Sequence, residues 1–575
     1  MNYKEKYNLW MNSEFISDET KNELKNVKDE KEIEDRFYKD LEFGTGGLRG
    51  MIGAGSNRMN IYTVSKASQG FANYLNENFK NPSIAIAYDS RHMSDQFALA
   101  AATTFCANGI KVYLYESLRP TPVLSFTVRH LKCSGGIVVT ASHNPKIYNG
   151  YKAYDEYGCQ LTDNKANIVI DHVNKVDDFS KVKKISKEEA LNKNLLNMIG
   201  KDVDEAYYEK VKGLSIRKDL VKEKADTLKV IYTPIHGSGN IPVRTVLKEL
   251  GYSNVSVVKE QEMPDGDFPT TSYPNPENAD VFNIALDMAK KQDTDIIFGT
   301  DPDCDRIGVV VKDSTGEYKV LTGNQTGILL THYVLSSLKE TGNLPDNGVV
   351  VKTIVTTEAA RTIAEDFGVE LIDVLTGFKY IGEKIREFNE AKNKTYLFGF
   401  EESYGYLAGT FVRDKDAVIA SMLVCEMALY YKQKGMSLYD ALMDIYKKYG
   451  YYNEKLVSLV LEGKEGQEKI GACLENMRHT PISEIDGVKV IKRLDYKESV
   501  EEDLKNNVKN EIKLPKSNVL KYILENGSYF VVRPSGTEPK MKVYLAVKGS
   551  SLEGSKKEIK EFESKVMEII NSKLN

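Results

Sequence analysis

One arrangement of strands and helices occurs three times along the chain, and each copy ends in a polar loop. Apolar runs typical of buried strands alternate with segments whose apolar spacing is that of helices. The three copies end in the loops at residues 140–145, 301–305 and 400–403. This alternation predicts α/β domains with mixed, largely parallel sheets. Because the spacing between the copies is uneven, we expect three related domains rather than a solenoid.

The pattern divides the chain into four predicted domains. The last is a smaller α+β domain, since two predicted strands flank a polar loop and a lysine- and glutamate-rich helix follows. The predicted limits are 1–215 for the domain with the serine loop, 216–325 for the domain with the acidic loop, 326–455 for the third α/β domain and 456–575 for the α+β domain.

Two stretches fall outside the repeated pattern. Residues up to 41 have apolar positions at helical spacing, which predicts an amphipathic helical segment. Residues 163–222 are rich in lysine and aspartate, so we expect them to form insertions or linkers.

The first loop places a serine at the edge of a predicted sheet. Ser142 lies two residues beyond the apolar strand predicted at residues 136–140. The carboxyl ends of parallel strands are where open α/β sheets bind their ligands. The residues that follow, His143, Asn144 and Pro145, favour a tight loop. We therefore expect Ser142 in a ligand-binding site.

The second loop concentrates carboxylates. Asp301, Asp303 and Asp305 alternate with other residues after a predicted strand, and in an extended backbone alternate side chains point to one side. At a separation of about 4 Å and an effective dielectric constant of about 20, each pair would repel by roughly 4 kcal/mol. A divalent cation with oxygen ligands removes this repulsion, so the run predicts a Mg²⁺ site, with a solvated acidic turn as the alternative. Arg306 and Lys312, at the sixth and twelfth positions, exclude a calcium loop of the EF-hand type.

Two further segments have the chemistry of anion-binding loops. The glycines of residues 43–50 would let a ligand approach the backbone and Arg49 could grip a phosphate, although a tight structural turn fits as well. The loop at residues 533–540 combines cations, hydroxyls and a turn-forming glycine: Arg533, Lys540, Ser535, Thr537 and Gly536. This combination predicts an anion nest, with a type I turn after Pro534 as the alternative.

Composition narrows the class of protein. Hydrophobic residues make up 41% and charged residues 28% of the chain, as in soluble globular proteins. The net charge of −5 gives no basic surface for nucleic acid. The six cysteines form no CxxC pair, which favours reduced thiols. With no apolar signal core and no span long enough for a bilayer, we expect a cytoplasmic protein without membrane or nucleic-acid partners.

Taken together, four motifs resemble the α-D-phosphohexomutase superfamily of phosphoglucomutases and phosphomannomutases. They are TASHNP at residues 140–145, DPDCDR at 301–306, FEESYG at 400–405 and RPSGTEP at 533–539. They occur in the family's order and cover nearly the whole chain, and the ensemble is most similar to the phosphoglucomutase/phosphopentomutase branch. The resemblance implies three related α/β domains and a smaller fourth around one central cleft.

The resemblance also implies roles for individual residues. Ser142 matches the family's phosphorylated serine, and Asp301, Asp303 and Asp305 match its Mg²⁺ ligands, with a phosphoserine oxygen as the fourth. Glu401 and Ser403 match a pair that holds sugar hydroxyls. The other matched substrate-binding positions are Arg306, Lys379 and the phosphate loop of Arg533, Ser535, Gly536 and Thr537.

Three matched positions are candidates for the catalytic chemistry: Arg49, His143 and Lys152. Lys152 falls where the family places a general base, but lysine titrates near 10.4 and would need a depressed pKa, so a cation that contacts phosphate is the alternative role. His143 is expected to orient Ser142 rather than to take part directly.

The implied activity is that of a phosphoglucomutase. It would move phosphate between C1 and C6 of glucose through a phosphoserine and a bisphosphorylated sugar, with Mg²⁺ as cofactor, a sugar 1,6-bisphosphate as activator and sugar phosphates as the binding partners. Phe400 and Ala417 stand where family members often have glycine, which leaves the sugar open. The alternatives are a phosphopentomutase, a phosphomannomutase, a glucose 1,6-bisphosphate synthase and a non-catalytic sugar-phosphate sensor.

Overall fold

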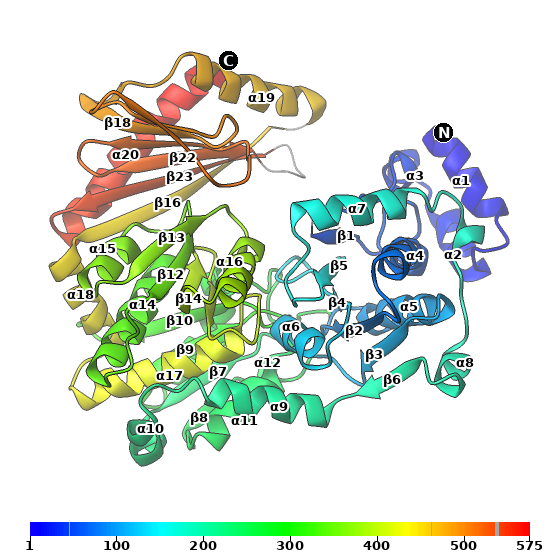
Figure 1. Ribbon diagram of the computed structural model, residues 1–575, viewed down its shortest axis with the longest axis horizontal. Helices are drawn as coiled ribbons and strands as arrows, with labels where there is room; N and C mark the ends of the chain where they lie inside the picture. Colours follow the sequence, from blue (N-terminus) through cyan, green and yellow to red (C-terminus); the bar gives the residue numbers. More distant parts are fainter. Residues whose placement is uncertain (45, 462, 535–539, 575) are drawn as a thin grey trace. The chain divides into compact units, whose positions relative to one another are not determined.

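The computed structural model describes residues 1–44, 46–461, 463–534 and 540–574. The chain forms two compact units. The first comprises Met1–Val349 and Phe378–Tyr439, and the second Val350–Gly377 and Asp440–Asn575. Figure 1 labels the helices and strands of both units.

The first unit begins its α/β architecture with a mixed sheet whose strand order is β1-β5-β4-β2-β3-β6. Strands β2, β3, β4 and β6 are parallel, while β5 runs antiparallel to β1 and β4. The strands span Gly47–Met51 (β1), Ser83–Tyr88 (β2), Lys111–Tyr115 (β3), Gly135–Val139 (β4), Tyr148–Asp155 (β5) and Leu196–Ile199 (β6).

Helices lie on both faces of this sheet for a topological reason. The connection from β2 to β3 and the one from β3 to β4 move in opposite directions along the sheet, so right-handed crossovers place α5 and α6 on opposite faces. α5 packs against α4, which also packs against α7, whereas α6 packs against β2, β4 and α9. These helices span Ile61–Asn78 (α4), Ser94–Ala107 (α5), Thr121–His130 (α6), Asp163–Asn174 (α7) and Lys201–Lys212 (α9).

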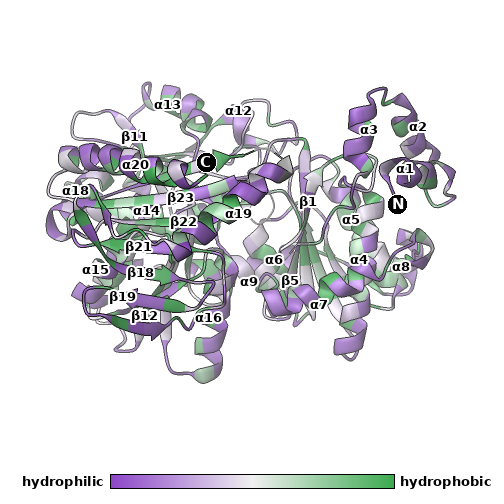
Figure 2. Cartoon of the chain, turned by 90° about the horizontal axis from the view of Figure 1, so that it is seen from above, coloured by the Kyte–Doolittle hydropathy of each residue, from purple (hydrophilic) through white to green (hydrophobic). Residues whose placement is uncertain are grey.

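The amino-terminal segment forms three helices, α1 (Tyr3–Asn12), α2 (Asp18–Asn26) and α3 (Glu30–Phe37). Each begins at an N-cap whose side chain accepts a backbone N–H of the first turn, and these N-caps are Asn2, Ser17 and Asp29. Their outward faces are polar, and Figure 2 colours much of them purple. Inward, Trp10 and Phe37 meet edge to face at 5.6 Å and pack with Tyr62 of α4. The predicted helical character of this segment is confirmed.

The segment predicted as insertions or linkers, residues 163–222, is instead structured. It contains α7, α9, a strand of the sheet (β6), α8 (Lys187–Asn192) and α10 (Lys218–Lys224). The expectation of a linker was wrong because most of the lysines and aspartates lie on the outer faces of these helices, while Val203, Tyr207 and Val211 of α9 are buried. Asp204 of α9 is buried as well and pairs with Arg119 at 2.7 Å.

The second sheet of the first unit has the order β11-β10-β9-β7-β8. Strands β7, β8 and β9 are parallel, and β10 runs antiparallel to β9 and β11. The strands span Val230–Thr233 (β7), Val255–Val257 (β8), Ile296–Thr300 (β9), Ile307–Lys312 (β10) and Tyr318–Val320 (β11). In the chain, α11 (Asn240–Glu249) connects β7 to β8, α13 (Asn283–Ala289) precedes β9, and α14 (Gly323–Glu340) follows β11.

The first unit also contains the hairpin of β14 (Thr395–Glu401) and β15 (Gly405–Ala408), with α16 (Phe378–Ala391) and α17 (Ala417–Gln433). Residues 417–431 of α17 are all buried. Among the described residues, no helix is long and apolar enough to cross a membrane. The six cysteines are buried free thiols, as the sequence predicts.

The second unit contains the carboxyl-terminal sheet, which is antiparallel with the order β16-β23-β22-β21-β18-β19-β20. Three of its strands are β18 (Val488–Asp495), β19 (Val500–Asp503) and β20 (Val508–Glu511). α20 (Leu552–Leu574) packs against β16 (Tyr451–Val460) and β23 (Lys540–Gly549), and Tyr522 of β21 (Leu520–Leu524) stacks on Phe530 of β22 (Tyr529–Pro534) at 4.7 Å. Sheet plus helix confirms the predicted α+β character of this domain.

Residues 350–377 belong to the second unit through a buried charge cluster. Lys521 donates to the backbone carbonyl of Ile354 at 3.1 Å and to Glu358 at 3.0 Å. Lys352, fully buried, lies 3.1 Å from the same Glu358 carboxylate. Although burial opposes ionisation, the two lysines hold the pKa of Glu358 well below its usual range.

Candidate active site

The loop that follows β4 holds Ser142 in a left-handed backbone conformation. Its φ is 51°, which non-glycine residues seldom adopt, and the backbone N–H of Ser142 donates to Thr140 Oγ1 at 2.8 Å. The side chain is buried, with the residue 4% exposed. The predicted tight loop is therefore present, and its strain indicates that surrounding contacts determine it.

Arg91 is the main contact that fixes this loop. Its guanidinium donates to the carbonyl oxygens of Ser142 at 2.6 Å, Pro145 at 3.0 Å and Tyr148 at 3.1 Å. Asp89, fully buried beside it, lies 3.3 Å from Arg91 Nε. The planar fork of donors suits several converging carbonyls better than a single ammonium would.

The acidic loop after β9 is a turn and not an extended segment. Asp301 Oδ1 accepts the backbone N–H groups of Asp305 and Arg306, both at 3.0 Å, and Cys304 has a φ of 53°. The expectation of an extended backbone was wrong, because these local hydrogen bonds curl the chain around Asp301. The curl still brings the carboxylates together: one oxygen each of Asp301, Asp303 and Asp305 lie within 4.8 Å of one another.

The serine loop and the acidic loop meet directly. Ser142 Oγ donates a hydrogen bond to Asp301 Oδ2 at 2.9 Å, and His143 Nδ1 lies 3.1 Å from the same hydroxyl. Burial, followed by the charges of Arg306 and Arg49, holds the pKa of His143 well below its usual range, so the ring is neutral. A neutral imidazole here can orient the hydroxyl.

The carboxylate set has the chemistry of a metal site. Asp303 Oδ1 and Asp305 Oδ1 are buried and receive no hydrogen bond from any described residue. Leaving a buried carboxylate oxygen without a partner is costly, and oxygen ligands of this kind suit Mg²⁺. Burial and then repulsion by Asp303 and Asp305 raise the pKa of Asp301 well above its usual range. The three residues fit a divalent cation.

Two lysines approach the set from other elements. Lys152 of β5 donates to Asp303 Oδ2 at 2.7 Å and Asp305 Oδ2 at 3.0 Å. Lys415, in the loop before α17, lies 3.2 Å from Asp305 Oδ2. Although burial opposes it, these ion pairs raise the pKa of both lysines and hold that of Asp305 well below its usual range.

Sequence reasoning missed two of these contacts. Lys415 stands in the charged run Arg413-Asp-Lys-Asp416, whose density of charge was its only signal. Thr121, at the start of α6, donates its hydroxyl to Asp303 Oδ2 at 2.7 Å and its backbone N–H to Asp303 O at 2.9 Å. A threonine at a helix start is ordinary capping chemistry, so nothing in the sequence marks it.

The remaining predicted residues of the first unit lie in several different elements. Arg306 is paired with Glu277 at 2.5 Å. Glu401 ends β14 and is 6% exposed, and burial raises its pKa. Ser403 lies in the turn before β15. In the same turn, the carbonyl of Tyr404 accepts a hydrogen bond of 3.2 Å from the backbone N–H of Ile307, which follows the acidic loop. The Glu401 turn is thereby joined to the acidic loop.

Arg49 and Lys379 differ in how they are engaged. Arg49 lies on β1 opposite Gly150, is exposed, and makes no hydrogen bond or ion pair with the described residues. Lys379 of α16 is paired with Asp163 of α7 at 2.6 Å. Arg533 is the penultimate residue of β22 in the second unit, and the predicted residues Ser535, Gly536 and Thr537 lie outside the described residues.

Phe400 points away from the Glu401 side of its strand. Its ring stacks between Phe398 and Tyr406 and packs against α14, where a Cβ on Gly327 would lie 2.1 Å from the ring. Adjacent residues of a strand face opposite sides, so Phe400 points away from the side that carries Glu401. Gly327 of α14, which has no side chain, makes room there for the Phe400 ring.

These features define a class of enzyme. A serine hydroxyl is hydrogen-bonded to a buried set of carboxylates that could hold a metal, and related α/β domains carry both. Such a site is suited to a mutase that transfers phosphoryl groups. Family models for phosphoglucomutase/phosphomannomutase α/β/α domains I, II and III and the C-terminal domain match residues 40–179, 205–316, 322–449 and 488–565. The chain belongs to the phosphoglucomutase/phosphomannomutase family, which confirms the resemblance and the fold class.

Known proteins agree with this assignment. A phosphoglucomutase of Staphylococcus haemolyticus is 38% identical over 521 residues, covering 90% of this chain and 92% of the relative. In fold, the chain matches the open form of the Paramecium phosphoglucomutase parafusin with a TM-score of 0.67 and 18% identity, over 93% of this chain and 95% of that one. An Aspergillus fumigatus N-acetylphosphoglucosamine mutase, solved with GlcNAc-6P and magnesium, matches with a TM-score of 0.50 and 14% identity over 92% and 96% of the two chains.

Proposed function

We propose that this chain catalyses the phosphoglucomutase reaction, the interconversion of α-D-glucose 1-phosphate and glucose 6-phosphate. The observation that carries the proposal is the 2.9 Å hydrogen bond from Ser142 Oγ to Asp301 within a buried set of three carboxylates. The identity to curated phosphoglucomutases over most of the chain supports the choice of sugar.

In the proposed cycle the phosphoryl group of phospho-Ser142 passes to the free hydroxyl of the sugar phosphate. The Oγ–P bond breaks as the new O–P bond forms, and the proton of the sugar hydroxyl ends on Ser142 Oγ, which gives a sugar 1,6-bisphosphate and the free serine. After this intermediate turns over, Ser142 Oγ accepts the other phosphoryl group. The Arg91 contacts hold the loop, and neutral His143 orients the hydroxyl, so the nucleophile is prepared before the sugar arrives.

Asp301, Asp303 and Asp305 would hold Mg²⁺ together with an oxygen of the phosphoserine. The cation would supply charge neutralisation at the transferring phosphoryl group, which is the main demand of this chemistry. The buried oxygens of Asp303 and Asp305 that accept no hydrogen bond from the described residues support this assignment. The magnesium bound in the Aspergillus mutase structure supports it as well.

Lys152 and Lys415 are proposed to act as cations that draw the phosphate towards the site. The ion pairs of Lys152 favour this role over that of a general base, since they raise its pKa. A pH–rate profile separates the two roles: replacing Lys152 with alanine leaves the profile unchanged if it only contacts phosphate, and removes one limb if it is the base.

The sugar and its second phosphate are proposed to contact residues of several elements. Glu401 and Ser403 bind sugar hydroxyls, and Arg306 and Arg49 contribute positive charge. Lys379 would exchange its pairing with Asp163 for a substrate group. Arg533, with Ser535, Gly536 and Thr537 of the same segment, is proposed to bind the non-reacting phosphate.

The experiment has two parts. Conversion of glucose 1-phosphate is measured beside ribose 1-phosphate and mannose 1-phosphate, and glucose should be turned over fastest. Label from ³²P-glucose 1,6-bisphosphate should appear on Ser142 and be absent in Ser142→Ala, while Ser314→Ala, in an exposed turn, keeps label and activity. Faster turnover of ribose 1-phosphate would replace the proposed sugar, and no label on Ser142 would end the mechanism.

A further inference from the structure

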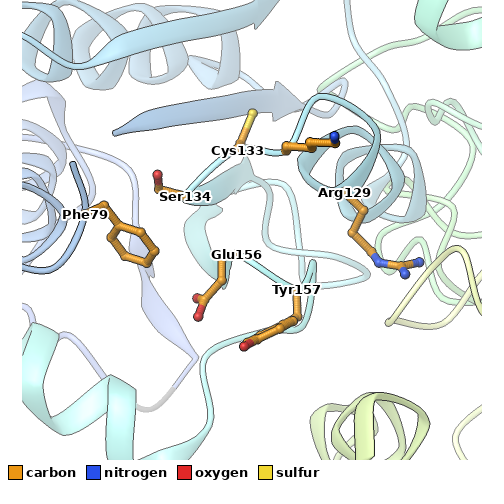
Figure 3. A pocket seen from close by; sticks show the side chains of 7 residues that line it. Phe79, Arg129, Cys133, Ser134, Glu156 and Tyr157 are labelled. Atoms are coloured by element: carbon orange, nitrogen blue, oxygen red, sulfur yellow. The ribbon is translucent and has the colours of Figure 1, made fainter. Parts of the chain in front are cut away.

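A cavity of about 370 Å³ lies on the first α/β domain, away from the serine loop. Figure 3 shows its lining side chains, which come from the end of α4, the end of α6, the turn into β4 and the residues after β5: Phe79, Arg129, Lys132, Cys133, Ser134, Glu156 and Tyr157. Ser134 precedes β4 and Ser142 follows it, so the cavity occupies the opposite edge of the sheet. Its volume is in the range of small-molecule sites.

The charges in this cavity are unbalanced. Glu156 is engaged by Lys165, which donates to both of its oxygens at 2.8 and 2.7 Å and also to Asp155 at 3.1 Å. Half-buried Arg129 makes one side-chain hydrogen bond within the described chain, to the carbonyl of Thr410 at 2.6 Å, and pairs with no described carboxylate. Exposed Lys132 has no ion pair or side-chain hydrogen bond among the described residues. Two cations are therefore left without a counter-charge.

We propose that this cavity binds a small phosphate monoester whose organic part is apolar, unlike a sugar, and that its occupancy lowers the rate of the mutase. Arg129, Lys132 and the hydroxyl of Ser134 supply donors for a phosphate, whose oxygens a guanidinium can take in pairs. The rings of Phe79 and Tyr157 supply apolar surface for the organic part of the ligand, a common composition for such sites.

The reason to expect an effect on rate lies in α6. Arg129 is in its last turn, and Thr121, about 12 Å away at the other end of the helix, bonds to Asp303. Arg129 also holds the carbonyl of Thr410, in the loop that carries Lys415 to Asp305. The same carbonyl also accepts from Arg413, so a phosphate that competes for the Arg129 guanidinium would leave Thr410 held by Arg413 alone and would loosen, through this loop, the position of Lys415.

Binding is tested with phenyl phosphate as the probe, titrated calorimetrically into the protein with saturating glucose 6-phosphate to block the active site. One binding event is expected. It should weaken roughly tenfold or more in Arg129→Gln and in Lys132→Asn, since each loses a charged hydrogen bond. Asparagine suits the left-handed φ of 53° at position 132. Lys193→Gln, an exposed lysine of the same domain, is the charge-matched control.

The rate is tested separately, and only this arm rests on the proposed function. Phenyl phosphate should lower kcat for glucose 1-phosphate in the unmodified protein and in Lys193→Gln, and leave it unchanged in Lys132→Asn. Binding that persists in both cavity variants, or that glucose 6-phosphate displaces completely, would overturn the site. Binding without any change in kcat would overturn the regulatory part, and a protein inactive on all sugars that still binds the probe would fail only the proposed function.

Discussion

The hydroxyl of Ser142 donates a hydrogen bond to Asp301 across 159 residues of sequence. Two loops from different domains thus share one contact at the point where a phosphoryl group would be transferred. The other carboxylate oxygen of Asp301, Oδ1, accepts the backbone N–H groups of Asp305 and Arg306 and so fixes the acidic turn. A change in either loop should therefore alter the position of the other.

Removing one carboxylate from the set should impair metal binding. We expect Asp303→Asn and Asp305→Asn to raise the Mg²⁺ concentration for half-maximal activity by roughly 100-fold, because a neutral amide oxygen is a weaker ligand and leaves less charge to attract the cation. A chelator should abolish activity and Mg²⁺ restore it. Asp287→Asn, on the exposed side of α13, is the control, and an unchanged Mg²⁺ dependence in both site variants would contradict the assignment.

Lys415 should be needed for turnover. Lys415→Met removes the ammonium 3.2 Å from Asp305, and we expect kcat/KM to fall roughly 100-fold, about 3 kcal/mol of transition-state stabilisation. Lys415→Arg should retain part of the activity, since it keeps the charge. Circular dichroism at the assay temperature separates this effect from unfolding. Wild-type kinetics in the methionine variant would remove Lys415 from the site.

Arg91 should position Ser142 without touching substrate. Arg91→Lys keeps the charge beside buried Asp89 but loses the fork that holds four carbonyls, those of Ser142, Asn144, Pro145 and Tyr148. We therefore expect a lower kcat with little change in KM. Arg91→Met leaves Asp89 buried without a cation and should lower the free energy of unfolding by about 3 to 5 kcal/mol. Chemical denaturation measures the second effect, and equal stability of the two variants would refute it.

Asp416 should make stability depend on pH. Burial raises the pKa of this carboxyl to about 7 in the folded protein, against 3.8 as its ordinary value, although it accepts hydrogen bonds from Tyr207 and Ile419. The folded state then binds a proton that the unfolded state has lost, so stability should fall as pH rises from about 4 to 7, by at most about 1.4 kcal/mol per pH unit.

The substitution that tests this is Asp416→Asn, which keeps an oxygen acceptor and cannot ionise. Its stability should exceed that of the unmodified protein at pH 8 and match it near pH 4, as measured by urea denaturation at both pH values. Asp171→Asn, exposed on α7, should leave the pH dependence unchanged. Parallel curves for Asp416→Asn and the unmodified protein would show that Asp416 is ionised throughout.

The amino-terminal helices should depend on a single aromatic residue. Trp10 is 3% exposed and meets Phe37, Tyr62 and Phe179 edge to face, so Trp10→Ala should destabilise the segment by about 3 to 5 kcal/mol. Leu9, its neighbour, is 50% exposed, and Leu9→Ala should change stability by about 0.5 kcal/mol or less. Limited proteolysis of the first 40 residues would detect the local opening, and equal cleavage of the two variants would contradict it.

The sequence predicted the parallel strands best, because they are buried on both faces and appear as apolar runs. β4 and β9 are examples, and Ser142 and Asp301 were found by their position after them. Strand β5 was missed because its sequence, Tyr148–Asp155, mixes polar and apolar residues, since Lys152 faces the acidic loop while Tyr151 faces the core. A strand with site residues on one face carries polar side chains there, so it lacks the continuous apolar run by which a buried strand is recognised in the sequence.

The site was predictable where motifs are local and obscure where it depends on packing between domains. Thr121 and Lys415 reach the aspartates only because α6 and the loop before α17 pack beside them, and no spacing in the sequence records this. The shape of the acidic turn was also missed, since its hydrogen bonds to Asp301 Oδ1 compete with an extended backbone. Residue types gave the chemistry, and tertiary contacts gave the geometry.

Because the six thiols are buried, the rate at which each one is modified reports how often the structure around it opens. Burial raises the pKa of Cys304, inside the acidic turn, well above its usual range, and it raises the pKa of Cys106 and Cys133 to about 12. Apart from Cys133, which lines the cavity described above, these thiols can therefore be alkylated only in molecules in which the surrounding structure has opened. The order in which the cysteines become modified would rank the domains by how readily each one comes apart.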